Sequence, residues 1–186
     1  SDLDLRVLRL GGGFTTIREY NWDGNLVWSY DNGRIHHDFH ICNNGDLLLP
    51  EWVAIPADLV PKVEGGYRKA PRLDFMFGDD IIRINRQGEE IGRWQTWQML
   101  NPAEAIISPL LGRLEWTHMN SIDVMPDGQF LASLRQISQV VLIDPHSHQI
   151  TWRIEEPEIS LQHHATSLGN GNIQIFDNGH LRPQSL

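Results

Sequence analysis

Short apolar runs separated by turn residues fill most of the chain, a pattern that predicts β-strands. Residues 14–20 and 26–30 are two such runs, and Asp23 with Gly24 between them is typical of a tight hairpin turn. Residues 139–144 and 149–154 form a second pair of this kind. The same strand–turn–strand pattern recurs along the chain, which therefore predicts an all-β protein.

Two segments interrupt this pattern. Residues 50–78 contain prolines and glycines that disfavour long regular elements, and they predict an extended loop that forms a lid or rim. Asn101 can cap a helix and Pro102 suits its first position, so residues 101–107 predict one short helix. We therefore expect a single domain over residues 1–186, with an inserted loop and short helix at about 50–79 and 95–115.

A repeat becomes visible when the turn glycines are aligned. Gly128 and Gly171 are 43 positions apart, which is the length of one four-stranded propeller blade. Gly45 and Gly128 are 83 positions apart, or one such blade plus an insertion. The repeat predicts a β-propeller built from four-stranded antiparallel blades.

About three to four blades fit into a chain of 186 residues, and four to eight are needed to close a ring. We expect an incomplete propeller, completed by further blades or by a second copy of the chain. Three tryptophans close hairpins at similar places in the repeat and are predicted to pack between neighbouring blades: Trp28, Trp94 and Trp152.

Composition narrows the possible partners. The net charge of -9 argues against a broad nucleic-acid surface, and the lack of a long apolar run argues against a transmembrane helix. Cys42 is the only cysteine, so it excludes an internal disulfide and is expected to be a buried structural thiol. Residues 1–4 do not resemble a signal peptide, and the chain is expected to be a fragment of a longer protein.

The repeat also places candidate catalytic residues at equivalent positions. The first strand of each blade lines the central channel of a propeller, so equivalent positions converge there. Eight residues before the three aligned glycines lie His37, Asn120 and His163. His118 lies two residues before Asn120 and is predicted to project to the same side. Arg135 ends the following strand and should return to the same rim.

These residue types leave three interpretations open. The histidines can be structural, they can bind a metal, or they can transfer an anionic group. A metal is disfavoured by the lack of short ligand spacing, by Arg135, and by Asp38 being the sole nearby carboxylate. A neutral histidine can be a nucleophile, while arginine and asparagine bind sulfuryl or phosphoryl oxygens. His36 and His164 alternate to the other face and rank below their neighbours.

Several short motifs in order resemble the PAPS-independent arylsulfotransferases. They occur at residues 36–38, 43–45, 118–121, 133–135, 162–165 and 176–179. The resemblance implies a six-bladed propeller that moves a sulfuryl group from an aryl sulfate to a phenol in a ping-pong reaction. It also implies a periplasmic or secreted enzyme. On the first interpretation, sulfuryl transfer, we expect no soluble cofactor and no metal.

The resemblance assigns a role to each candidate residue. His163 matches the nucleophile that becomes sulfated, and His118 and Asn120 match the residues beside it. Arg135 matches the arginine that holds the sulfate, with Asn120 and His37 also placed at the substrate. The alternatives are a non-catalytic propeller that binds a ligand or a protein and, after that, a metal-dependent hydrolase or lyase.

Overall fold

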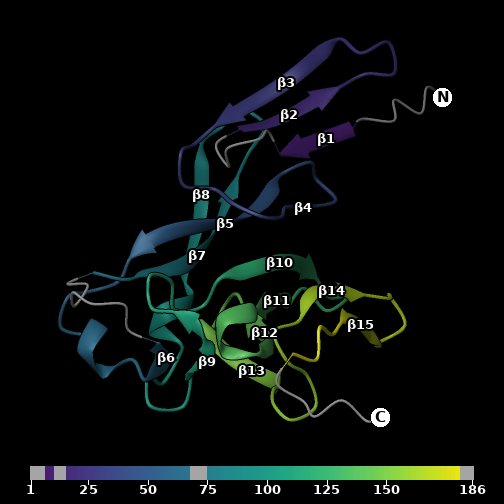
Figure 1. Ribbon diagram of the computed structural model, residues 1–186. Helices are drawn as coiled ribbons and strands as arrows, with labels where there is room; N and C mark the ends of the chain where they lie inside the picture. The colour runs from purple at the N-terminus through teal and green to yellow at the C-terminus, as the bar shows by residue number, and fades with distance from the viewer. Residues whose placement is uncertain (1–6, 11–15, 68–74, 181–186) are drawn as a thin grey trace.

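The computed structural model describes residues 7–10, 16–67 and 75–180, and it is an all-β structure of small antiparallel sheets (Figure 1). Within each antiparallel sheet the strands pair in chain order, although β6 (Gly65–Tyr67) lies between two strands of the second sheet in the sequence and belongs to another sheet. The first sheet contains β1 (Val7–Leu10), β2 (Thr16–Tyr20) and β3 (Leu26–Asp31). The glycines at 11–13 and the first two residues of the predicted strand 14–20 lie outside the described residues.

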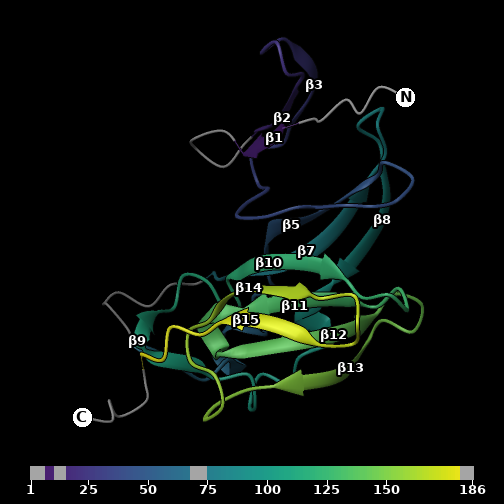
Figure 2. The same ribbon diagram turned by 90° about the vertical axis from the view of Figure 1, so that its right-hand side faces the viewer.

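Two four-stranded antiparallel sheets follow, as the repeat predicted. The second sheet contains β4 (His40–Ile41), β5 (Leu47–Ala54), β7 (Phe77–Ile84) and β8 (Glu90–Gln95). The third contains β10 (Met119–Val124), β11 (Phe130–Leu134), β12 (Gln139–Asp144) and β13 (Gln149–Ile154). Strands β14 (His163–Ser167) and β15 (Ile173–Phe176) form a two-stranded sheet, with β14 beside β10 in Figure 1 and Figure 2.

The interrupting segments contain a small parallel pair, β6 (Gly65–Tyr67) and β9 (Ile107–Gly112). Helical structure in the described residues is limited to short 3-10 turns at η1 (Val60–Lys62), η2 (Thr96–Gln98) and η3 (Arg135–Ile137). Within this part of the chain, no helix is long and apolar enough to cross a membrane.

The predicted helix at 101–107 is wrong. Asn101 does begin a turn, because its side-chain Oδ1 accepts the Ala103 N–H at 3.1 Å and its carbonyl accepts the Ala105 N–H at 2.8 Å. The chain then extends, since the Ile107 N–H donates to the Glu64 carbonyl at 3.0 Å. Pairing with the inserted loop therefore outweighs the local cap, which stabilises a helix by only about 1 kcal/mol.

Pro50 does not end its strand, contrary to the prediction from the 50–78 segment. Strand β5 runs through it for eight residues and pairs with β7 along its whole length. The Pro50 carbonyl accepts the His36 N–H at 3.2 Å, so this side of the residue faces away from β7. The backbone nitrogen of Pro50 is on the same side as its carbonyl. Because β7 lies on the other side, the lack of an N–H at Pro50 removes no hydrogen bond between β5 and β7. Pro71 lies outside the described residues.

The core lies between consecutive sheets, and strand alternation supplies both faces. On β5, Leu47 and Leu49 pack toward the first sheet while Leu48 packs toward the third. On β11, Leu131 packs toward β14 and β15 while Ala132 faces back to the second sheet. Because successive side chains point to opposite faces, sheets buried on both sides need the nearly continuous apolar runs seen in the sequence.

Tryptophans join the sheets at equivalent positions. The Trp28 indole N–H donates to the Arg86 carbonyl at 2.8 Å, and the Trp94 indole N–H donates to the Pro145 carbonyl at 2.8 Å. Each acceptor lies in the turn between the last two strands of the next sheet. The predicted packing of these two residues between sheets is confirmed, whereas Trp152 on β13 is 42% exposed.

A second repeated contact joins the strands that start the sheets. The Ile122 N–H donates to the Asp38 carboxylate at 3.1 Å, and the Ala165 N–H donates to the Ser121 hydroxyl at 2.9 Å. Asp38 and Ser121 each lie seven residues before an aligned glycine, and both acceptors serve the following sheet. The structure therefore contains the same residue-to-residue correspondence between sheets that the alignment of the turn glycines predicted. Cys42 is half-buried against the main core, and this burial raises its thiol pKa.

Candidate functional site

Two of the predicted residues, His37 and His118, are in direct contact. Their ring centroids lie 4.5 Å apart in an edge-on arrangement. Each residue precedes the first strand of its sheet and adopts a left-handed backbone, with φ of 57° and 51°. The prediction that His118 follows strand alternation with Asn120 is wrong, because His118 lies outside β10 and the register shifts between Met119 and Ser121. This left-handed backbone and its tertiary contacts orient the ring instead.

His37 stands in a partly desolvated cluster of rings. Its Nδ1 lies 2.9 Å from Nδ1 of His36, so one of these two nitrogens donates a hydrogen to the other. Burial, followed by the neighbouring His118 and His36, lowers the pKa of His37 to about 4. His37 is therefore a neutral imidazole at neutral pH, which suits a hydrogen-bonding role better than a charged one.

Asp79 on β7 holds the backbone that carries both histidines. It is fully buried, and its Oδ1 lies 3.0 Å from Nε2 of His36. Its other oxygen accepts the Thr117 hydroxyl and, at 2.7 Å, the Met119 N–H. Burial acts to raise the pKa of Asp79, but His36 and these hydrogen bonds outweigh it and lower the pKa. One carboxylate thus fixes the neighbour of His37 and both neighbours of His118.

Glu115 contacts the His118 ring directly. Its Oε2 lies 2.6 Å from His118 Nδ1 and accepts the Trp52 indole N–H at 3.2 Å. Trp52 in turn stacks on His36 with 4.4 Å between ring centroids. Burial favours a raised pKa for Glu115, but the hydrogen bond and charge of His118 bring it below the usual value.

The expectation that Asp38 is the sole nearby carboxylate is therefore wrong, since Asp79 and Glu115 both reach the histidines. Sequence signals for them did exist. Glu115 lies three residues before His118, and Asp79 and Asp80 form an acidic pair in a largely apolar strand, where a buried acid needs partners. Trp52 and Asp79 were missed because their roles depend on contacts between segments far apart in the sequence, whereas the Glu115–His118 contact is local and could have been found.

Arg135 and Asn120 reach the same region through different groups. Arg135 begins η3, and its backbone N–H donates to the His118 carbonyl at 3.2 Å, so the predicted return to the His118 end is confirmed. The Asn120 side chain is buried and its amide donates to the Gln162 carbonyl at 2.8 Å. Asn120 therefore fixes the residue immediately before His163.

His163 is the first residue of β14, and its Nδ1 lies 2.7 Å from Oδ1 of Asn178. Asp177 beside Asn178 is held by the N–H groups of Ser160 and Gly179, at 2.8 and 3.0 Å. An amide oxygen accepts only, so a hydrogen bond to Oδ1 of Asn178 requires the hydrogen on Nδ1 of His163, and in a neutral ring with this hydrogen bond the lone pair is on Nε2. The structure brings His37 and His118 together and ties Asn120 to β14, whereas the polar partner found for the His163 ring is Asn178.

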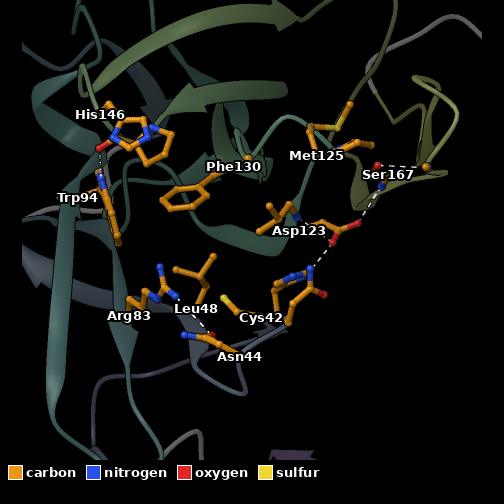
Figure 3. Close-up of a pocket in the computed structure, with 17 residues that line it drawn as sticks. Cys42, Asn44, Leu48, Arg83, Trp94, Asp123, Met125, Phe130, His146 and Ser167 are labelled. Atoms are coloured by element: carbon orange, nitrogen blue, oxygen red, sulfur yellow. Dashed lines mark hydrogen bonds and ion pairs between the residues drawn. The ribbon is translucent and has the colours of Figure 1, made fainter.

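A separate hollow of about 730 Å³ opens at the opposite, turn-glycine ends of the strands. Figure 3 shows Cys42, Leu48, Trp94, Phe130 and Arg83 around it. At one side, the His40 ring lies 2.8 Å from Asp123. None of the five predicted site residues lines this hollow. Within the described residues, no group of three or more His, Cys, Asp or Glu side chains is arranged to hold a metal ion.

Comparison with known proteins shows a family match and a distant structural likeness. A sequence model of the arylsulfotransferase (ASST) family matches residues 8–160, a segment that contains four of the predicted residues and ends before His163. A protein of unknown function from Bacteroides caccae, whose crystal structure was determined at 1.35 Å, is 14% identical with a TM-score of 0.49. That alignment covers 91% of this chain and 48% of the other, so this chain spans about half the length of that structure. A search of curated proteins found no match.

Proposed function

The chain belongs to the arylsulfotransferase family, and we propose that it carries the active site for moving a sulfuryl group from an aryl sulfate to a phenol. The observation that carries this proposal is the contact between the His37 and His118 rings, inside the segment that matches the family. Two imidazoles at 4.5 Å, with the carboxylates of Glu115 and Asp79 nearby, form a site suited to proton transfer.

His163 is the proposed nucleophile. The hydrogen bond to Asn178 leaves the lone pair of His163 on Nε2, which is the nitrogen free to attack sulfur. In the first half-reaction, the Nε2–S bond forms while the bond between sulfur and the aryl oxygen breaks. The phenolate that leaves takes a proton from an imidazolium in the site. The product of this step is a sulfohistidine.

The second half-reaction reverses these events with a new phenol. Its hydroxyl gives its proton to the imidazole that was deprotonated in the first half-reaction. The phenol oxygen then bonds to sulfur as the bond between sulfur and His163 Nε2 breaks. Arg135 is proposed to hold the sulfuryl oxygens by charge-assisted hydrogen bonds, with neutral His37 as a further donor. Asn120 positions β14 through its amide and thereby the nucleophile.

The sheets are proposed to be blades of an incomplete β-propeller, about three to four of a complete six. The repeated tryptophan contacts and the repeated Asp38 and Ser121 contacts support this arrangement, because each relates one sheet to the next in the same way. Further blades or a second copy of the chain would complete the ring. The family resemblance supports a periplasmic or secreted location and a reaction without a soluble cofactor.

The proposal is tested by incubating the purified protein with nitrophenyl sulfate and following nitrophenol release and acid-labile sulfate on the protein. We expect labelling in the wild type and none in His163→Ala. His146→Ala is the matched control, since His146 is exposed in the β12–β13 turn and should label normally.

Other outcomes have distinct meanings. Label that persists in His163→Ala removes His163 as the nucleophile. A folded wild type that releases no phenol from any aryl sulfate supports the non-catalytic binding module. Activity that is abolished by a chelator and restored by zinc supports a metal-dependent hydrolase.

A further inference from the structure

Two N–H donors converge on one carboxylate oxygen beside the histidine pair. Glu115 Oε2 lies 2.6 Å from Nδ1 of His118 and 3.2 Å from the Trp52 indole nitrogen. The Glu115 and His118 side chains are 21% and 20% exposed, so solvent weakens their interaction only in part. A carboxylate that is held in this way fixes both the orientation and the tautomer of its histidine.

We infer that Glu115 is a positioning residue that makes His118 the proton carrier of the proposed reaction. The inference rests on the proposed sulfuryl transfer. Glu115 keeps a hydrogen on Nδ1 of His118, so that Nε2 is the nitrogen that gives and takes the substrate proton. Glu115 also balances the positive charge of His118 while the ring holds both hydrogens.

The other imidazole of the pair is less suited to this task. His37 lies in a buried cluster, where desolvation and the adjacent His118 and His36 favour its neutral form. Two imidazoles at 4.5 Å also oppose double protonation, because like charges repel strongly in a desolvated site. The contacts thus separate the pair into a neutral ring and a ring that is paired with a carboxylate.

Trp52 and Asp79 fix the positions of Glu115 and His118 relative to each other. Trp52 links Glu115 to the second sheet and stacks on buried His36. Asp79 binds the residues on either side of His118 through the Thr117 hydroxyl and the Met119 N–H. Since a positioning residue needs its own supports, this network is what the role requires.

The protons balance over one complete reaction. In the first half-reaction, protonated His118 gives its Nε2 proton to the departing phenolate as the bond between sulfur and oxygen breaks. In the second, the acceptor phenol returns a proton to Nε2 as its oxygen bonds to sulfur. His118 ends in its starting state, and no additional reactant is needed.

The first test is nitrogen–proton correlation spectroscopy of the imidazole rings at about pH 8, where an ordinary imidazole is neutral. We expect the wild-type His118 to carry its hydrogen on Nδ1, and Glu115→Leu, which lacks an acceptor, to lose this preference. If Nδ1 of wild-type His118 is unprotonated and Nε2 carries the hydrogen, the inference is overturned, whatever the activity of the protein.

The second test compares phenyl sulfate with nitrophenyl sulfate in single turnovers. Phenolate is a poor leaving group and depends on the proton, whereas nitrophenolate leaves readily without it. Glu115→Gln should slow phenol release roughly tenfold or more and nitrophenol release less than about threefold. Glu64→Gln, at an exposed glutamate of the inserted loop, is the control and should match the wild type for both substrates.

Each remaining outcome decides a separate point. Equal slowing of both substrates by Glu115→Gln would show a structural effect and overturn the proton-transfer role. A wild type that turns over neither substrate would overturn the proposed function and, with it, the catalytic part of this inference. The position of the His118 hydrogen would still be decided by the spectrum.

Discussion

The imidazoles of His37 and His118 lie 4.5 Å apart although each belongs to the loop that enters a different sheet. Both loops use a left-handed residue to turn the chain, which is uncommon for a side chain other than glycine. Buried Asp79 holds the two loops together by contacting His36 from one and Thr117 with Met119 from the other. Backbone strain of this kind persists where surrounding contacts fix it, and it is frequent at functional sites.

The free energy of unfolding should decrease as the pH is lowered and His37 becomes protonated. Burial lowers the pKa of His37 from 6.5 to about 4, so the folded state favours neutral imidazole. The unfolded chain takes up this proton first, so the contribution is complete above about pH 6.5 and is lost as the pH falls toward 4. Urea titrations of the wild type and His37→Gln across this window measure it. The wild type should lose more unfolding free energy than the variant, and equal losses would contradict the prediction.

Asp79 and Asp80 are adjacent buried acids, and we expect substitutions of the two to destabilise the protein to different extents. Asp79→Asn should lower the unfolding free energy by about 3 kcal/mol, because it disrupts a buried charge with several partners. Asp80→Asn should cost less than about 1 kcal/mol, since burial raises the pKa of Asp80 and Arg93 keeps Glu51 and Glu90. Chemical denaturation of both variants tests the order, and a reversed order would contradict it.

Asn178 should control the reactivity of His163 without controlling the fold. Asn178→Ala removes the oxygen that accepts the His163 Nδ1 hydrogen, so the lone pair is no longer confined to Nε2. The rate of sulfate labelling is expected to fall roughly tenfold to a hundredfold. Asn172→Ala, in the exposed β14–β15 turn, serves as the control and should label at the wild-type rate. Unchanged labelling of Asn178→Ala would exclude this role.

The tryptophan contacts between sheets predict another pair of unequal effects. Trp94→Phe removes the hydrogen bond to the Pro145 carbonyl and reduces the packing against Phe130, whose ring centroid lies 4.7 Å away. The expected loss of unfolding free energy is about 1–2 kcal/mol. Trp152→Phe should cost less than about 0.5 kcal/mol, because Trp152 is 42% exposed. Urea denaturation midpoints distinguish the two variants.

The repeat in the sequence predicted the sheets and the alignment of their starting residues, because turn glycines and strand alternation are local properties. It failed at residues 101–107, where Ile107 joins a strand from the inserted loop, and at Pro50, whose missing N–H faces away from its partner strand. Both failures depend on which neighbour a backbone group finds in space. Local propensity does not contain that information.

For the candidate site, the sequence determined which residues start the sheets and that Arg135 returns to His118. Tertiary structure alone decided the orientation of the His118 ring, the burial of His36 and the reach of Asp79 and Trp52. Hydrogen-bond partners, burial and the resulting pKa values arise from groups brought close by packing between sheets. The chain therefore specifies the repeat through local patterns, whereas the chemistry of its histidines is set where those repeats meet.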